Sequence, residues 1–124
     1  MTDKVLIRLP WPPKVLSPNG RTRSHAYKHR VEQEYKRACM MEALPFKQKL
    51  RDCEPEAIVI TFHPLPRGPL PDRDNAIASF KYGQDALAET WGINDAVLRP
   101  SYEFGSRVPG GCVIVEIMAR RAGT

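Results

Sequence analysis

The segment AIVITFHPLPRGPLPDRDN, residues 57–75, decides the fold because it joins a strand, a stiff loop and the start of a helix. Residues 57–63 are rich in β-branched and aromatic side chains, which favours a strand. Residues 64–71 contain four prolines and one glycine, so they form neither a helix nor a central strand. Asp74 or Asn75 is then placed to cap a helix that begins at Asn75.

The sequence before this segment predicts one strand and one helix. Apolar and charged side chains alternate over residues 4–9, which is typical of a strand with one buried face. A helical apolar repeat follows over residues 24–44. Ser24 is its expected N-cap, and Pro45 is expected to end it.

The sequence after the segment predicts a second helix and a β-hairpin. The helix is expected to cover residues 75–89 and to be closed by Gly92, with close packing at Gly83. The stripe expected to face the sheet consists of Ile77, Phe80, Gln84, Leu87 and Trp91. Residues 102–108 and 112–118 flank a Pro-Gly-Gly turn, which favours a hairpin.

These elements predict a single α+β domain over residues 1–124, with the order β-α-β-α-β-β. The expected architecture is a sheet of about four strands, mixed or antiparallel, with two helices packed on one face. Residues 119–124 are expected to form a frayed tail.

Length and composition exclude several classes of protein. With 124 residues, 42% of them hydrophobic and 27% charged, the chain suits one globular domain. No apolar run approaches the roughly 20 residues that a membrane span needs, and no signal peptide is recognisable. Three cysteines without a CxxC pair predict reduced thiols rather than disulfides or a zinc site. A cytoplasmic protein without a membrane partner is expected.

Positive charge is concentrated near the N-terminus. Residues 14–37 hold seven Lys/Arg and two Glu, while the formal net charge of the chain is +5. Such a segment suits the phosphate backbone of a nucleic acid. The alternative is a solvated helix face without a polyanionic partner.

A group of acidic residues lies apart from this basic segment. Asp72 and Asp74 are two residues apart, and in extended backbone such side chains point the same way. Two carboxylates held close repel each other unless a cation or a proton lies between them. Mg²⁺ and Mn²⁺ prefer oxygen ligands of this kind. With Lys81, Asp85 and Asp95 further along, a metal site that acts on a polyanion is predicted; the alternative is that these acids are helix caps and ion pairs.

Other motifs with similar residues do not fit. An EF-hand loop that began at Asp72 would need an oxygen-bearing side chain and a glycine where Ala76 and Ile77 stand. The chain contains neither a P-loop GxxxxGK[ST] nor a GxSxG nucleophile motif. His25 and His29 are four apart, but an HxxxH pair without a glutamate base is more typical of an exposed basic helix face.

Together these residues resemble the RusA-like endodeoxyribonucleases, which are Holliday junction resolvases of phage and prophage origin. The resemblance covers nearly the whole chain, and the combined pattern is more specific than any of its pieces. It is carried by Leu9-Pro10-Trp11-Pro12-Pro13, Ser17-Pro18-Asn19, Ile60-Thr61-Phe62-His63-Pro64, Asp72-Arg73-Asp74-Asn75, Lys81, Asp85-Ala86-Leu87 and Gly92-Ile93-Asn94-Asp95.

The resemblance implies that Asp72, Asp74 and Asp95 bind the metal and that Lys81 is the catalytic lysine. Lys81 stands four residues before Asp85, as the family's lysine stands before its own aspartate. Two departures from the family affect these residues. The stretch before Lys81 is roughly one helical turn longer than in the best-known member. An asparagine also stands where many members carry the first of two aspartates, which leaves Asp95 as the expected acid.

The expected activity is Mg²⁺-dependent hydrolysis of DNA phosphodiester bonds, with Mn²⁺ able to substitute, in the resolution of Holliday junctions during DNA recombination and repair. The metal would activate a water, and Lys81 would stabilise charge that develops on the phosphate. Asp85 would orient Lys81 or pair with it along the helix, and Asn75 would be a further neighbour. Because a four-way junction is cut on two strands, a homodimer is expected. The candidate contacts to the DNA backbone are Arg21, Arg23, Lys28, Arg30, Arg67 and Arg73.

Two other functions fit the same residues. A metal-dependent nuclease of other specificity would use the same site without requiring branched DNA. A non-catalytic DNA-binding module would use the basic segment, with the acids as caps and ion pairs, and would keep its function in Asp72→Asn.

Overall fold

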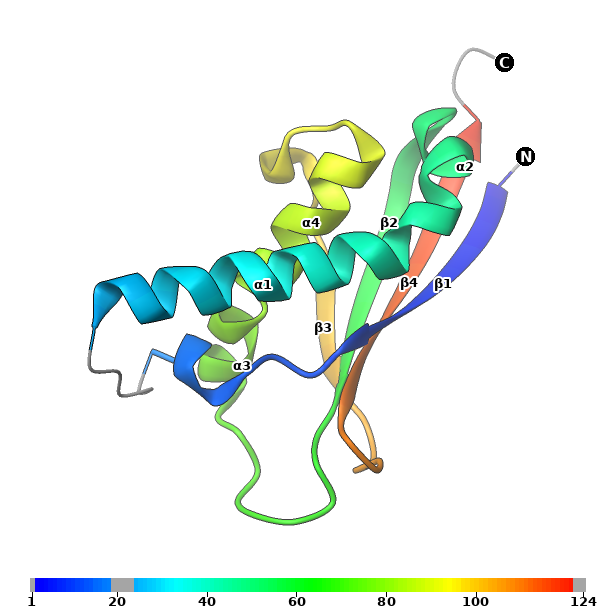
Figure 1. The fold of residues 1–124 in the computed structure, drawn as a ribbon. Helices are drawn as coiled ribbons and strands as arrows, with labels where there is room; N and C mark the ends of the chain where they lie inside the picture. The colour runs from blue at the N-terminus through cyan, green and yellow to red at the C-terminus, as the bar shows by residue number, and fades with distance from the viewer. Residues whose placement is uncertain (1, 19–23, 122–124) are drawn as a thin grey trace.

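The computed structural model describes residues 2–18 and 24–121, apart from the side chains of Thr2 and Asp95. In this part of the chain the strands are β1 (Thr2–Pro10), β2 (Cys53–His63), β3 (Ser101–Phe104) and β4 (Cys112–Arg121). The α-helices are α1 (His25–Ala43), α2 (Lys47–Arg51), α3 (Arg73–Ser79) and α4 (Lys81–Trp91). Short 3₁₀ helices are η1 (Lys14–Leu16), η2 (Leu44–Phe46) and η3 (Asp95–Val97). They form the single α+β domain with a four-stranded mixed sheet that the sequence predicts (Figure 1).

β4 lies inside the sheet and β3 lies at its edge. The strand order is β1-β4-β2-β3, with β4 antiparallel to both of its neighbours and β3 parallel to β2. The predicted hairpin of residues 102–108 and 112–118 is therefore wrong, because β2 lies between β3 and β4. The buried, apolar β4 suits a strand with a partner on each side, whereas β3 is short and mostly exposed. α3 and α4 provide the long crossover that a parallel pair requires.

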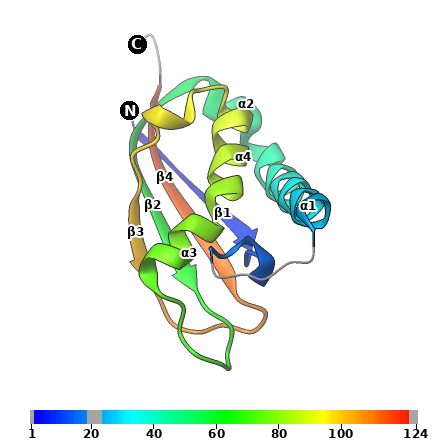
Figure 2. The same cartoon turned by 90° about the vertical axis from the view of Figure 1, so that its left-hand side faces the viewer.

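The helices pack on one face of the sheet, as predicted (Figure 2). This face consists of alternate apolar residues of the long strands, of which Ile7, Ile60 and Val115 are almost fully buried. Tyr35 of α1 and Leu87 of α4 belong to the same core. Each such side chain contributes about 1.5–3 kcal/mol relative to an exposed one, so this layer holds helices and sheet together.

The first helix largely confirms the prediction. Ser24 is the N-cap of α1, and its Oγ accepts a hydrogen bond from Tyr27 N at 3.1 Å. The buried residues of α1 are Val31, Tyr35, Cys39 and Ala43. α1 ends at Ala43 with Leu44 as its C-cap, so the predicted end of the helix before Pro45 is confirmed, and two short separate helices, η2 and α2, follow it to Arg51. Proline is tolerated in the first turn of a helix, which is where Pro45 stands in η2.

The second predicted helix is interrupted at Phe80, so the prediction of one helix over residues 75–89 is wrong. Phe80 ends α3 and precedes α4, and its ring is fully buried against Phe62, with ring centroids 5.8 Å apart at 88°. A Cβ on Gly83 would lie 2.3 Å from Cε1 of Phe80. The predicted close packing at Gly83 is therefore confirmed, and the neighbour that requires the glycine is the Phe80 ring.

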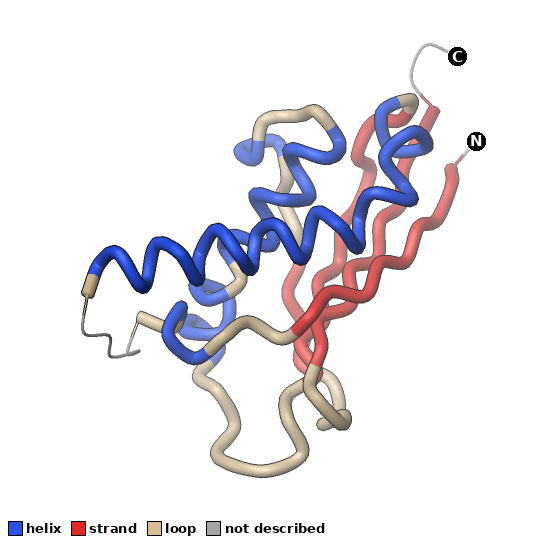
Figure 3. Tube along the Cα trace, viewed as in Figure 1, coloured by secondary structure: helices blue, strands red, loops and turns tan. Residues whose placement is uncertain are grey.

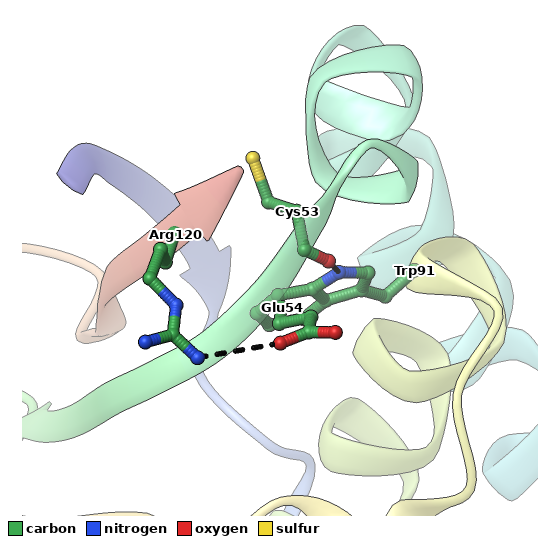
Figure 4. Close-up of polar contacts among 4 residues, drawn as sticks. All are labelled: Cys53, Glu54, Trp91 and Arg120. Atoms are coloured by element: carbon green, nitrogen blue, oxygen red, sulfur yellow. Dashed lines mark hydrogen bonds and ion pairs between the residues drawn. The ribbon is translucent and has the colours of Figure 1, made fainter. Parts of the chain in front are cut away.

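The end of α4 is anchored to the sheet. Gly92 closes the helix with a φ of 84°, as predicted. The indole Nε1 of buried Trp91 donates a 3.0 Å hydrogen bond to the backbone oxygen of Cys53 (Figure 4). Nearby, Nη2 of Arg120 lies 3.5 Å from Oε2 of Glu54 across β4 and β2. This contact is exposed and adds little stability.

Other predictions concern the end of the chain, its thiols and membranes. Residues 119–121 belong to β4, so the frayed tail predicted from residue 119 is wrong for this stretch; residues 122–124 lie outside the described part. The cysteines are free, as predicted, and all three are buried. Over the described ranges, no helix is both long and apolar enough to cross a membrane.

Candidate active site

The candidate site lies where β2, the loop of residues 64–71 and α3 meet (Figure 3). The loop contains no helix or strand, as its prolines predict. The segment before β4 supports it: Val108 N donates to Pro64 O at 2.9 Å, and Nη1 of Arg107 donates to Leu65 O at 3.1 Å. These hydrogen bonds fix the first part of the loop that leads to the candidate aspartates.

Asp72 and Asp74 lie in one turn at the start of α3, and both are exposed. Asp72 is the N-cap, because its Oδ1 accepts a hydrogen bond from Asp74 N at 3.2 Å. The cap predicted at Asp74 or Asn75 is therefore wrong. The two aspartates are neighbours through this capping turn, and not through the alternation of an extended backbone. A carboxylate has about four lone-pair sites, so one hydrogen bond leaves Asp72 with capacity for a cation.

Lys81 lies in a cluster of polar side chains at the contact between α4 and α1. It is the exposed first residue of α4, and its Nζ lies 6.0 Å from the centroid of the Tyr82 ring. The Tyr82 hydroxyl donates a 2.6 Å hydrogen bond to Oε2 of Glu32 on α1. This bond raises the pKa of Tyr82 to about 12, with contributions from burial and from the negative charges of Glu32 and Asp85. Asp85, half-buried, lies one turn further along α4, and the bend at Phe80 separates this group from the two aspartates.

Asp95 is the first residue of η3, which lies at the opposite end of α4 from α3 (Figures 1 and 2). α4 has 11 residues, and a helix rises about 1.5 Å per residue, so about 16 Å of helix lies between these positions. The side chain of Asp95 lies outside the described part, and its role as a metal ligand stays a prediction. Among the side chains that are described, no three of His, Cys, Asp and Glu form a group able to hold a metal.

The predicted phosphate-binding residues near the N-terminus are only partly described. Arg21 and Arg23 lie outside the described residues, as does Asn19 of the sequence pattern. Lys28 is half-buried and Arg30 is exposed, and both lie near the start of α1. That end of α1 approaches the site through η1, which contacts both α1 and α3.

The two predicted arginines that flank the aspartates differ in their contacts. Arg67 is exposed on the loop and lines the cleft described below. Arg73 stands between the two aspartates in sequence but reaches β3. Its Nη1 donates to Tyr102 O at 3.3 Å, and its guanidinium lies 5.9 Å from the centre of the Phe104 ring. Arg73 therefore joins the start of α3 to the edge of the sheet.

A cleft of about 550 Å³ opens beside Asp72. Residues 11–14 and Ser17, which follow β1, form one wall, and residues of the 64–71 loop form another. Asn75 and its neighbours on α3 line the rest. Lys14 contributes an exposed positive charge. The sequence did not predict this wall. The Trp-Pro-Pro run after the first strand was the only local sign of it, and the position of that run beside α3 depends on tertiary packing.

Comparison with known proteins gives a family. No model of a known protein family matches the chain. The chain is 35% identical over 118 residues to a protein of Xylella fastidiosa (strain Temecula1 / ATCC 700964) called "Uncharacterized protein", and the match covers 87% of this chain and 72% of that protein. This chain belongs to the family of that protein. The name of that protein states no activity.

A solved structure with a similar arrangement is "IspF (Plasmodium falciparum) CDP complex". The likeness covers 97% of this chain and 94% of that chain, with a TM-score of 0.40 and 9% sequence identity. A likeness this weak carries no argument about the fold or the function of the present chain.

Proposed function

We propose that this chain is a Mg²⁺-dependent endonuclease of the RusA-like type, which resolves Holliday junctions in DNA recombination and repair. The observation that carries the proposal is the pair of exposed carboxylates, Asp72 and Asp74, in one turn beside a cleft that Lys14 and Arg67 line. Carboxylates next to cations suit a divalent metal and a phosphodiester bound together. The sequence resemblance supplies the specific reaction.

The two aspartates fit a magnesium ion that shares its coordination with a substrate. Mg²⁺ usually keeps several waters and is held by one or two carboxylates plus substrate phosphates. Asp72 and Asp74 would supply these carboxylates, and Asp95 is a further proposed ligand on the strength of the resemblance alone. The bound ion would supply an activated water and polarise a phosphoryl oxygen.

The remaining residues would bind and stabilise the phosphate. Lys81 is the proposed catalytic lysine, since an exposed ammonium at the start of α4 is accessible to a polyanion and can stabilise charge in the transition state. Asp85 would orient it. Lys28, Arg30 and Arg67 would neutralise DNA phosphates, which gives affinity and salt dependence but no sequence readout.

A homodimer is part of the proposal. A four-way junction is two-fold symmetric and is cut on two strands, whereas one chain carries one candidate site. A dimer with two-fold symmetry presents two sites at once. Light scattering of the protein, alone and with a junction, measures this directly. A single protomer per junction would contradict the paired cleavage.

The test is cleavage of a labelled four-way junction beside a linear duplex of the same sequence, with Mg²⁺ and with EDTA. The proteins are the wild type, Asp74→Asn and Asp52→Asn, which makes the same chemical change at an exposed aspartate after α2. We expect paired nicks in the junction alone, dependent on Mg²⁺, lost in Asp74→Asn and kept in Asp52→Asn. Asp74→Asn should keep or strengthen junction binding, because it removes a negative charge that faces phosphate.

Two other results would each select a different function. Equal cutting of junction and duplex would indicate a nuclease of other specificity. Tight binding without cutting by the wild type would indicate a DNA-binding module. One observation favours this function: Asp72 accepts a hydrogen bond from Asp74 N, which gives its carboxylate a structural role.

A further inference from the structure

We propose that the cleft beside Asp72 binds one nucleobase of the substrate, unstacked from its neighbours, with the phosphate of that nucleotide near Lys14 and Arg67. The inference rests on the proposed function for the identity of the substrate as DNA. Base binding itself requires neither a metal nor cleavage, so it can be measured separately.

The cleft has the size and the surface chemistry of a site for a small flat ligand. Its volume of about 550 Å³ lies within the roughly 300–1,000 Å³ that is usual for small-molecule sites. Trp11 and five prolines, two beside it in the sequence and three from the 64–71 loop, give it apolar walls, which suit the faces of a base. Ser17 and Asn75 lie among them. An amide that both donates and accepts, like that of Asn75, suits the polar edge of a base.

One wall of the cleft is held in place by contacts with the core. Trp11 packs edge-to-face on buried Phe62, with ring centroids 6.3 Å apart at 87°. The preceding residue, Pro10, is tied to α1 because the Tyr35 hydroxyl donates to its backbone oxygen at 2.7 Å. A Cβ on Gly111 would lie 3.1 Å from Trp11, so this side of the indole is closely packed as well. A wall that is already fixed loses little entropy when a ligand binds.

The charges on the cleft favour a nucleotide over an apolar peptide or lipid. Lys14, from the segment after β1, and Arg67, from the 64–71 loop, are exposed cations that both line the cleft. Positive groups beside an aromatic wall are the combination by which proteins bind single-stranded nucleic acid, where stacking on an aromatic ring strengthens binding of each base. Taking a base out of its stack costs least where the base is already unpaired. A branch point in DNA is therefore a suitable source of such a base.

The probe is a deoxynucleoside 5′-monophosphate, titrated into ¹⁵N-labelled protein in EDTA and followed by two-dimensional NMR. Its control is 2-deoxyribose 5-phosphate, which has the same phosphate and sugar without a base. We expect the nucleotide to shift the signals of the Trp11 indole, the Asn75 side-chain amide and the Gly68 and Gly110 backbone amides, all of which line the cleft. The sugar phosphate should bind about tenfold more weakly, because it cannot stack.

Variants connect the signal to the cleft. Ala76→Leu places a larger side chain at a buried position that lines the cleft and should abolish nucleotide binding, whereas Ala78→Leu, at an exposed position of the same helix, should preserve it. Lys14→Glu is a second variant that keeps the test valid if Ala76→Leu fails to fold, since Lys14 is exposed. It should weaken binding at least about tenfold, by the loss of one phosphate contact, while Arg99→Glu should not.

The outcomes separate this inference from the proposed function. Equal binding of nucleotide and sugar phosphate, or shifts that avoid the cleft, would overturn the base site. Nucleotide binding at the cleft in a protein that cuts no DNA would support the base site and overturn the nuclease. Junction cleavage without nucleotide binding at the cleft would overturn the base site alone.

Discussion

The hydroxyl of Tyr82 donates a 2.6 Å hydrogen bond to Oε2 of Glu32, and this bond joins the start of α4 to the middle of α1. A second contact between the same helices lies nearer their other ends, where Nζ of Lys36 is 3.0 Å from Oε2 of Glu89. Lys81 immediately precedes Tyr82, with its Nζ beside the Tyr82 ring. The packing of α1 against α4 therefore helps to set the position of Lys81, the proposed catalytic lysine.

Tyr82→Phe should lower the free energy of unfolding by about 1 kcal/mol at neutral pH and the Tm by about 4 °C. The pKa of Tyr82 in the folded state, about 12, is above the value of about 10 for an unfolded tyrosine. The bond therefore stabilises fully below about pH 10, and its contribution is lost as the pH rises toward 12. Urea unfolding of both proteins across this range should show their difference shrinking.

Tyr27→Phe is the matched control for this prediction, because Tyr27 is an exposed tyrosine of α1. It should change the unfolding free energy much less at any pH. A difference between wild type and Tyr82→Phe that stayed constant up to pH 12 would show that the hydrogen bond to Glu32 does not contribute to stability in solution.

Gly83→Ala should destabilise the protein by about 1–3 kcal/mol, the usual effect of overpacking a core. The new methyl would lie 2.3 Å from Cε1 of Phe80, whose ring is fully buried against Phe62 and so cannot move away freely. This exceeds the roughly 1 kcal/mol by which alanine is favoured over glycine in a helix. Denaturant unfolding of the single variants and the double variant with Phe80→Leu measures the coupling.

The double variant decides whether the ring is the cause. Leucine at position 80 removes the ring atoms that the methyl would meet, so Gly83→Ala should be nearly neutral or stabilising in that background. If Gly83→Ala destabilised both backgrounds equally, the requirement for glycine would have another origin.

The elements that the sequence predicted correctly are those that a local pattern specifies. Ser24 as a cap and Gly92 as a helix end are local signals, and each is confirmed. The break at Phe80 was missed because the apolar repeat continues through it, and only the core determines where the ring goes. The hairpin was wrong because the partner of β3 depends on β2 lying between it and β4, which no turn sequence reveals.

The candidate site follows the same rule. The position of Asp72 and Asp74 at a helix start could be predicted, because the proline loop and the helix are local features. The wall formed by Trp11 and Lys14 could not, since it comes from the other end of the chain. The separation between Asp95 and α3 could be predicted in part from the sequence. The residues between Lys81 and Gly92 form a helix, and a helix holds the segments at its two ends apart.

Asp72 should show two separable roles, as a cap and as a metal ligand. Asp72→Asn keeps an oxygen that can accept from Asp74 N, so its stability should change by only a few tenths of a kcal/mol, whereas Asp72→Ala should lose about 1 kcal/mol. Mg²⁺ should raise the Tm of the wild type, since a ligand that binds only the folded state stabilises it. Both variants should lose this rise, and Asp52→Asn should keep it. A Mg²⁺ effect retained in Asp72→Asn would leave Asp72 as a cap alone.

Lys81→Ala should reduce the rate of junction cleavage by about 10²–10³, which is the usual effect of removing one group that stabilises charge in a transition state. Because Lys81 is exposed, its loss should leave the Tm almost unchanged. Junction affinity should change far less than the rate, since one phosphate contact among several is lost. Single-turnover cleavage and equilibrium binding, measured on the same protein, separate the two effects.

Lys47→Ala is the control for this variant, because Lys47 is an exposed lysine at the start of α2, with the same charge. It removes the same net charge from the protein and should leave both the rate and the affinity close to those of the wild type. If Lys81→Ala lowered affinity and rate equally, Lys81 would be a binding residue that acts before the transition state. Full cleavage by Lys81→Ala would remove it from the reaction, and the search for the catalytic cation would then move to Lys14 and Arg67 at the cleft beside Asp72.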